Sequence, residues 1–283
     1  MVEDKNVMKR RTLTLLLASQ AGLSPVLTAE PLLNRITQKF KNAKPMKTAP
    51  ASLIVRRSSE RGHADHGWLK SYHSFSFADY YDPAHMGFRS LRVINEDHIA
   101  PGGGFPTHPH RDMEIFSYVV KGALQHKDSL GNGRVLQPGQ IQLMSAGKGV
   151  LHSEFNPASD VTTHMLQIWI QPRQRGLVPS YTEWHPKPAH ETDPKVLVIS
   201  SDGRDGSATI QQDADVYRVR LPKGETLAQE VRSGRGVWFQ LIKGSVTIGE
   251  VVLEAGDAIS SEIDGTLSFT AGNDAEGLLF DLG

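Results

Sequence analysis

The sequence predicts an all-β fold made of two tandem β-sandwich or jelly-roll barrels. Short strand-like runs recur at intervals of roughly ten residues and are bounded by Gly, Pro, Asn and Asp, which is typical of sandwiches and barrels. Helical periodicity over long windows is absent. The strings that begin at Tyr118 and Leu136 recur in related form at Gln240 and Leu253. We therefore expect two copies of one β-unit.

The composition of the 283-residue chain excludes several classes of protein. The sequence contains no Cys, which excludes disulfide scaffolds, Cys-ligated zinc, iron–sulfur clusters and thiol nucleophiles. Any soft-metal chemistry must therefore use His and carboxylates. The 31 Lys and Arg residues balance 31 Asp and Glu residues, a balance that gives no electrostatic footprint for nucleic acid. We expect no nucleic-acid partner.

Residues 1–50 are predicted to form an N-terminal extension outside both barrels. An uncharged run over residues 12–29 is too short and too polar to span a bilayer as a stable helix. The pair Arg10-Arg11 stands just before this run. The run itself begins with an apolar stretch and ends at a small residue, Ala29. This arrangement resembles a twin-arginine export signal, which we place over residues 1–29.

The rest of the extension, residues 30–50, is rich in Lys and Pro and is typical of a tether. An export signal predicts a periplasmic protein. The alternative is a disordered basic extension on a cytoplasmic protein that starts at Met46. No other apolar run approaches membrane length, so we expect no stable membrane insertion.

The strands of the first unit are expected in order along the chain, at Ser90–Asn95, Glu114–Val120, Gln140–Ser145 and Met165–Gln171. A hairpin is predicted at Gly131-Asn132-Gly133. Several Pro residues between 172 and 188 interrupt strand pairing. We therefore place an N-terminal barrel at 51–178 and a C-terminal barrel at 179–283.

The 12 His residues all precede residue 191, so a His-based metal site can lie only in the first unit. His108 and His110 stand at i and i+2, which puts both imidazoles on the same face of a strand. His152 and Glu154 repeat this spacing. Three neutral imidazoles and one carboxylate form a site suited to iron, manganese, cobalt, nickel, copper or zinc. Open positions on an octahedral ion would remain for a substrate.

The stretches Gly102–Gly122 and Gly139–Asn156 resemble the paired cupin motifs, and longer strings resemble the pirin family. These strings include His73-Ser-Phe-Ser-Phe77, Leu91-Arg-Val-Ile-Asn95, Thr107–Ile115, Met144-Ser-Ala-Gly147, His152-Ser-Glu154 and Gln167-Ile-Trp169. The resemblance spans roughly residues 53–185 and is strongest to the bacterial pirin-like quercetin 2,3-dioxygenases. It implies a bicupin fold with metal bound only in the N-terminal barrel.

The resemblance also implies the ligand set of one divalent metal ion, namely His108, His110, His152 and Glu154. Glu114 stands where many cupins place their carboxylate ligand, but the pirin pattern takes its acid from Glu154. We expect Fe²⁺ as the native ion, with Zn²⁺, Cu²⁺, Ni²⁺, Mn²⁺ and Co²⁺ as alternatives.

The activity implied by the resemblance is opening of the C ring of quercetin-like flavonols by O₂, with release of carbon monoxide. Glu154 is the candidate catalytic base for the 3-hydroxyl proton of the flavonol. The expected partners are O₂ and a flavonol or a related small enolisable substrate. The protein is expected to be a monomer. The alternative is a non-enzymatic pirin that senses metal or redox state and acts as a regulatory binding protein.

Other residues have two open interpretations. His63, His66 and His73 precede the motifs and are expected to be structural or cavity-lining rather than catalytic. The aromatic residues near the motifs could line a cavity for a flat ligand or could belong to the core of the sandwich. They are Phe105, Phe116, Tyr118 and Phe155.

Overall fold

A computed structural model describes residues 53–283, which fall within one compact unit. The predicted export signal and tether lie outside the described residues. The described residues form 22 strands in four sheets and three short 3-10 turns, and they contain no α-helix. The predicted all-β class is therefore confirmed. Nothing helical in residues 53–283 has the length and apolar character needed to cross a membrane.

The first barrel consists of two sheets. A seven-stranded sheet has the order β12-β9-β6-β11-β4-β3-β2, and a four-stranded sheet has the order β5-β10-β7-β8. The strands are β2 (Gly62–Asp65), β3 (Leu69–His73), β4 (Leu91–Ile99), β5 (Gly104–His110), β6 (Glu114–Lys121), β7 (Leu124–Asp128), β8 (Gly133–Leu136), β9 (Ile141–Ser145), β10 (Val150–Phe155), β11 (Thr163–Ile170) and β12 (Ser180–Trp184).

The second barrel repeats this plan with the sheet orders β1-β20-β17-β22-β15-β13-β14 and β16-β21-β18-β19. Its strands are β1 (Ile54–Arg56), β13 (Lys195–Ser200), β14 (Ala208–Thr209), β15 (Ala214–Leu221), β16 (Thr226–Val231), β17 (Gly236–Lys243), β18 (Ser245–Ile248), β19 (Val251–Glu254), β20 (Ala258–Ser261), β21 (Gly265–Ala271) and β22 (Ala275–Leu282). The 3-10 turns cover Ser58–Glu60, Pro188–Glu191 and Arg204–Gly206.

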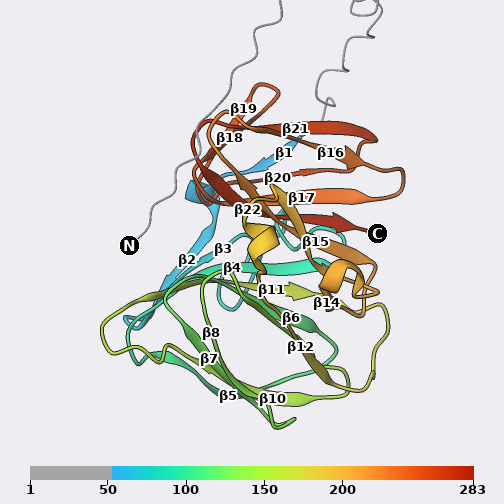
Figure 1. The fold of residues 1–283 in the computed structure, drawn as a ribbon. Coiled ribbons are helices and arrows are strands. Elements are labelled where there is room, and N and C mark those ends of the chain that lie inside the picture. The colour runs from blue at the N-terminus through green and yellow to red at the C-terminus, as the bar shows by residue number, and fades with distance from the viewer. Residues whose placement is uncertain (1–52) are drawn as a thin grey trace, which may run out of the picture. The chain divides into compact units, whose positions relative to one another are not determined.

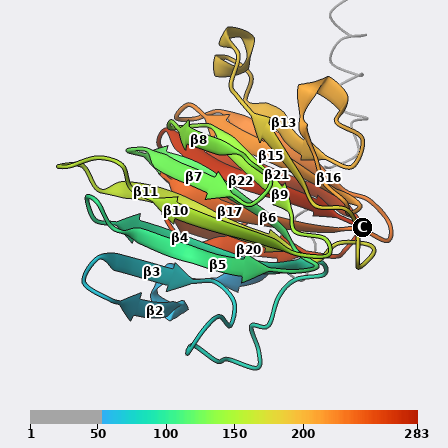
Figure 2. The same ribbon diagram turned by 90° about the horizontal axis from the view of Figure 1, so that it is seen from below.

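The four sheets stack as layers, with the two seven-stranded sheets back to back in the middle (Figure 1). The largest hydrophobic cluster lies between these two sheets and joins Phe116 and Ile168 of the first barrel to Trp238 and Phe280 of the second. The four-stranded sheet of the first barrel faces away from this interface, and Figure 2 shows it from below, with β10 between β7 and β5. The two predicted tandem sandwiches are thus confirmed.

The sequence predicts a boundary between the barrels at residue 178, but two strands belong to the barrel on the other side of it. β12 follows that boundary but pairs with β9 of the first barrel over all five of its residues. β1 begins the described chain but pairs with β20 of the second barrel, where Val55 packs against the apolar interior. The Pro residues around β12 interrupt the chain on both sides and leave Ser180–Trp184 itself free to pair.

The interiors of the two barrels differ in polarity. The second barrel is filled by a continuous apolar cluster, whereas the apolar residues inside the first form two smaller clusters. Three buried positions on adjacent strands are polar in the first barrel and apolar in the second. They are Ser117, Gln142 and Gln167 in the first barrel and Phe239, Ile259 and Leu279 in the second. The sets correspond in register, because Ser117 pairs with both Gln142 and Gln167 while Phe239 pairs with both Ile259 and Leu279.

Candidate metal centre

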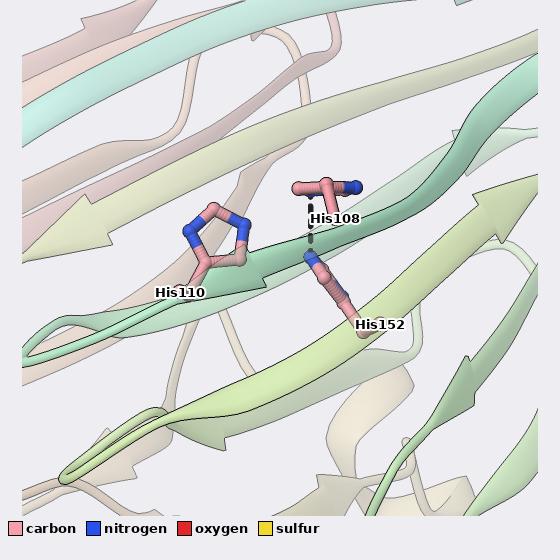
Figure 3. Close-up of side chains that lie close together, drawn as sticks. All are labelled: His108, His110 and His152. Atoms are coloured by element: carbon pink, nitrogen blue, oxygen red, sulfur yellow. Dashed lines mark hydrogen bonds between the residues drawn. The ribbon is translucent and has the colours of Figure 1, made fainter.

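Three imidazoles meet on two adjacent strands of the first barrel. β5 and β10 run antiparallel, and their register places His152 directly opposite His108. His110 lies two residues beyond His108, on the same face of β5. Figure 3 shows the three rings close together, and one ring nitrogen from each lies within 4.8 Å of the others. The i and i+2 spacing of His108 and His110 and the register of β5 with β10 therefore bring the three imidazoles together.

The spacing and chemistry of these nitrogens fit a divalent transition metal. The Nε2 atoms of His108 and His152 are 3.1 Å apart. Two imidazole nitrogens bound to one ion at ~2.1 Å, roughly at right angles, lie ~3.0 Å from each other. Nδ1 of His108 is 2.8 Å from the carbonyl oxygen of Pro106. Because a carbonyl only accepts hydrogen bonds, Nδ1 carries the proton and Nε2 keeps the lone pair that a metal requires.

The imidazoles of His110 and His152 are held in the neutral form. Burial, followed by the neighbouring His152 and His108, lowers the pKa of His110 to about 4. Burial, followed by His108 and His126, lowers the pKa of His152 to about 3. Neither ring needs to lose a proton before it can bind a metal at neutral pH.

The carboxylate of Glu154 lies in a buried cage of hydrogen bonds. Its Oε1 accepts hydrogen bonds from Ser117 Oγ and Gln142 Nε2, both at 2.8 Å, and its Oε2 accepts one from Gln167 Nε2 at 2.6 Å. The register of β5 and β10 shifts between His152 and Glu154. A carboxylate oxygen of Glu154 groups within 4.8 Å of ring nitrogens of His126 and His152, whereas His108 and His110 belong to the other group. Its role as a fourth ligand therefore stays a prediction.

Glu114, the carboxylate position of many cupins, is directed to a different place. Its Oε1 accepts a hydrogen bond from Ser145 Oγ at 2.5 Å, and its Oε2 accepts one from the backbone N–H of Gln211 in the second half of the chain. Glu114 does not line the cavity next to the three imidazoles. This placement supports the choice of Glu154 over Glu114.

A cavity of about 580 Å³ adjoins the centre and lies within the size range of small-molecule sites. His108, His110 and Glu154 contribute to its wall. Its aromatic lining residues are Trp68, Phe77, Tyr80, Phe105 and Trp169, and its further polar lining residues include His63, His66, Ser71, His73, Asn95, Asp97 and Gln167.

The structure distinguishes the His and aromatic residues that line the cavity from those that belong to the core. His63, His66 and His73 line the cavity, and so does Phe105. Phe116 and Tyr118 instead belong to the core between the barrels.

Several residues of the site did not emerge from the sequence. His126 and Asp128 stand at i and i+2 on β7, the same donor spacing as His152 and Glu154, and this signal was available. The cage around Glu154 gives a weaker signal, which is the presence of polar residues at alternate positions of otherwise apolar strands.

The fold and the site together define a bicupin with a candidate metal centre in its first barrel. The strands of the second barrel contain no His, and the groups of metal-ligating side chains found in residues 53–283 all lie in the first. A family model described as Pirin matches residues 54–170, and one described as the quercetinase C-terminal cupin domain matches residues 197–282. The chain belongs to the pirin family.

Relatives of known name cover most of the chain. The quercetin 2,3-dioxygenase of Escherichia coli K12 is 46% identical over 230 residues, which are 81% of this chain and 98% of that protein. A pirin-like protein of Caulobacter vibrioides is 41% identical and covers 81% of this chain and 99% of its own length. The expected enzyme class, a quercetin 2,3-dioxygenase-type oxidoreductase, is thus confirmed at the level of the family.

Solved structures also place the chain with the bacterial pirins. The crystal structure of the bacterial pirin YhhW from Escherichia coli in complex with nickel(II) superposes with a TM-score of 0.78 and is 46% identical. The match covers 82% of this chain and 99% of YhhW. A quercetin 2,3-dioxygenase from Acinetobacter baumannii has a TM-score of 0.64 at 22% identity, which shows the shared fold alone.

Proposed function

We propose that the protein is a metal-dependent dioxygenase that opens the C ring of quercetin-like flavonols with O₂ and releases carbon monoxide. The observation that carries this proposal is the meeting of His108, His110 and His152, with His108 and His110 in the wall of an aromatic-lined cavity. The relatives named quercetin 2,3-dioxygenase support the choice of substrate class.

The residues that would hold the metal are His108, His110, His152 and Glu154. When bound, a divalent ion at this position would act as a Lewis acid that lowers the pKa of a flavonol hydroxyl. We propose Fe²⁺ as the native ion, with Zn²⁺, Cu²⁺, Ni²⁺, Mn²⁺ and Co²⁺ as the alternatives to be separated by metal analysis.

We propose Glu154 as the base that accepts the proton of that hydroxyl. A carboxylate oxygen offers about two lone-pair directions. Both directions on Oε1 are engaged by Ser117 and Gln142, whereas Oε2 has a single donor, Gln167. One direction on Oε2 thus stays available, and the three donors prevent the carboxylate from turning away. A carboxylate held in this way at a cavity wall is a competent general base.

The aromatic wall of the cavity suits a flat, mostly apolar ligand. The rings of Trp68 and Phe105 meet edge to face at 5.1 Å, and those of Phe77 and Trp169 do so at 5.4 Å. Such paired rings form rigid walls against which the fused rings of a flavonol can pack.

The test measures O₂ consumption and carbon monoxide release by the full chain loaded with Fe²⁺, with quercetin as substrate. Ala at His108, His110 or His152 is expected to abolish both the stoichiometric metal and the turnover. Full metal occupancy in all three variants would refute the ligand assignment. A fully loaded wild-type protein that consumes no O₂ would refute the enzymatic proposal and favour the regulatory binding protein.

We also propose that residues 1–29 direct export and that the mature protein is a monomer. Replacement of Arg10-Arg11 by two Lys residues is expected to retain the protein in the cytoplasm, because twin-arginine recognition depends on both guanidinium groups. Cell fractionation measures this, and an unchanged distribution would favour the cytoplasmic alternative. Light scattering of the purified protein tests the monomer.

A further inference from the structure

One wall of the cavity contains a buried carboxyl group that the proposed reaction does not use. Asp97 lies on β4 and is only 2% exposed, yet it lines the cavity. The charged groups that act on it are other acids, and it forms no ion pair within residues 53–283. Burying a carboxyl group without a cation is costly unless hydrogen-bond donors surround it. A ligand that supplies a donor would offset this cost.

One oxygen of Asp97 is held by the protein, and the other is open to the cavity. Oδ1 accepts a hydrogen bond from Ser71 Oγ at 2.5 Å, which is the only hydrogen bond to this side chain within residues 53–283. Oδ2 therefore has no partner there. It is not among the unpartnered side-chain atoms that are closed to solvent. Because Asp97 lines the cavity, Oδ2 opens into it.

A second polar side chain without a partner lies beside Asp97. Asn95 stands two residues earlier on β4, so it shares the same face of the strand, and it also lines the cavity. The side-chain amide of Asn95 makes no hydrogen bond within residues 53–283, and its Oδ1 is buried. An amide and a carboxyl group side by side suit a ligand hydroxyl, because a hydroxyl can both donate and accept.

The fold itself does not require an acid at this position. Asp97 lies two residues beyond the strand partner of Gln167. In the second barrel, Val219 lies two residues beyond the strand partner of Leu279, which is the counterpart of Gln167. Val219 therefore occupies the position of Asp97, and it is buried in the apolar cluster of that barrel. One backbone plan thus accepts an apolar side chain here, which points to a ligand as the reason for the acid.

The other walls of the cavity select an aromatic ligand for this acid. Trp68, Phe77, Phe105 and Trp169 line the same cavity. A flat ligand packed against such rings presents its polar groups at its edge. Hydroxyls are the edge groups of phenols, and quercetin has several besides the one proposed to bind the metal.

We propose that Asp97 is a specificity-determining residue whose Oδ2 accepts a hydrogen bond from a ring hydroxyl of the substrate other than the hydroxyl at the metal. This inference rests on the proposed function and deepens it, because it restricts the substrates to flavonols with further hydroxyls on their rings. A buried hydrogen bond to a carboxyl group contributes about 10- to 100-fold in affinity.

The test compares the binding of two flavonols to the full chain loaded with Zn²⁺. This ion has no redox chemistry, so binding is measured without turnover. The ligands are quercetin and 3-hydroxyflavone, which has only the hydroxyl proposed to bind the metal. Trp68 and Trp169 line the cavity, so quenching of Trp fluorescence reports binding. The wild-type chain is expected to bind quercetin about 10- to 100-fold more tightly than 3-hydroxyflavone.

Asp97→Val introduces the residue found in the second barrel. It is expected to weaken the binding of quercetin by about 10- to 100-fold and to leave the binding of 3-hydroxyflavone within about threefold of wild type. Asp79→Val is the matched control, because Asp79 also lines the cavity but is exposed to solvent. Water replaces hydrogen bonds at an exposed site, so neither affinity should change.

Asp97→Asn keeps the shape of the side chain and tests the proposal if Asp97→Val fails to fold. Ser71 donates to the amide oxygen, so the amide nitrogen faces the cavity and cannot accept the hydroxyl proton. The preference for quercetin is expected to fall by at least about threefold.

Thermal unfolding of each variant accompanies the binding measurements. Equal losses of affinity for both flavonols in the Asp97 variants would indicate a packing role and would overturn the proposal. A wild-type chain that binds both flavonols equally would also overturn it. A wild-type chain that binds neither flavonol would instead refute the proposed function, so the two failures are distinguishable.

Discussion

Asp97 is a fully buried acid in the cavity wall. Burial, opposed by the hydrogen bond from Ser71 and aided by the nearby Glu154 and Glu96, raises the pKa of Asp97 to about 7. Ser71 Oγ also lies 2.9 Å from Nε2 of His73, so the three side chains form a polar row along the wall. The cavity thus contains an acid that changes charge near neutral pH.

The raised pKa of Asp97 predicts how stability depends on pH. The folded chain binds this proton more tightly than the unfolded chain, so the contribution is complete below about pH 4 and is lost as the pH rises through about 7. Asp97→Asn mimics the protonated acid. Relative to wild type, the variant should therefore gain stability between pH 4.5 and 8, on the order of a few kcal/mol. Urea unfolding of chelator-treated protein measures the difference, and parallel pH profiles would contradict the prediction.

Glu154 gives a second prediction at the scale of one residue. Glu154→Gln preserves the shape of the side chain but removes the negative charge that accepts a proton. Turnover of quercetin should fall by ~10²- to 10⁴-fold, as is typical when a general base is lost, while much of the metal is retained. Steady-state kinetics and elemental analysis on the same preparation measure both quantities. Unchanged turnover would leave Glu154 as a ligand or without a role.

At the scale of strands, β6, β9 and β11 differ from β17, β20 and β22 in the polarity of three matched positions. Ser117, Gln142 and Gln167 donate hydrogen bonds to Glu154, whereas Phe239, Ile259 and Leu279 fill the same positions with apolar groups. The two barrels therefore use one backbone plan for different purposes. The first interior supports a buried carboxylate, and the second is packed with apolar side chains.

This difference predicts the effect of Gln167→Leu, which introduces the residue found in the second barrel. Glu154 would lose the donor to Oε2, and a hydrogen bond to a charged group contributes ~1.5–3 kcal/mol. We expect destabilisation of that size together with slower quercetin turnover. Gln137→Leu, at an exposed position, is the control and should change neither quantity. If both variants unfold alike in urea, the cage around Glu154 has no energetic role.

The sequence predicts the strands and the shared face of His108 and His110 because both depend on local spacing. A period of two residues places His108 and His110 on one face wherever β5 pairs. The cage around Glu154 depends on which strands become neighbours, and local patterns do not specify this. Strand exchange was missed for the same reason, since β1 and β20 are separated by almost the whole described chain.

At the scale of the whole molecule, the two barrels share an extensive apolar interface and exchange edge strands. Separating the chain at residue 178 would remove β12 from the first barrel and β1 from the second. It would also expose Phe116, Ile168 and their neighbours in the central cluster to water. Exposed apolar patches of this kind promote association.

We therefore predict that residues 51–178 and 179–283, produced separately, do not form stable monomers. Each should aggregate or unfold at low denaturant concentration, whereas the intact chain unfolds cooperatively. Size-exclusion chromatography and urea unfolding of the two fragments and of residues 51–283 test this. Two monomeric fragments with sharp transitions would show that the barrels are independent.

The pairing of β1 with β20 has a consequence for biosynthesis. Ile54–Arg56 emerges early from the ribosome but finds its partner, Ala258–Ser261, only when the chain is nearly complete. The second barrel therefore closes late, after translation has almost ended. Proteolytic maturation upstream of Ile54 leaves this closure intact, whereas a cut just beyond Arg56 would strip the edge and expose the backbone of β20 to other chains.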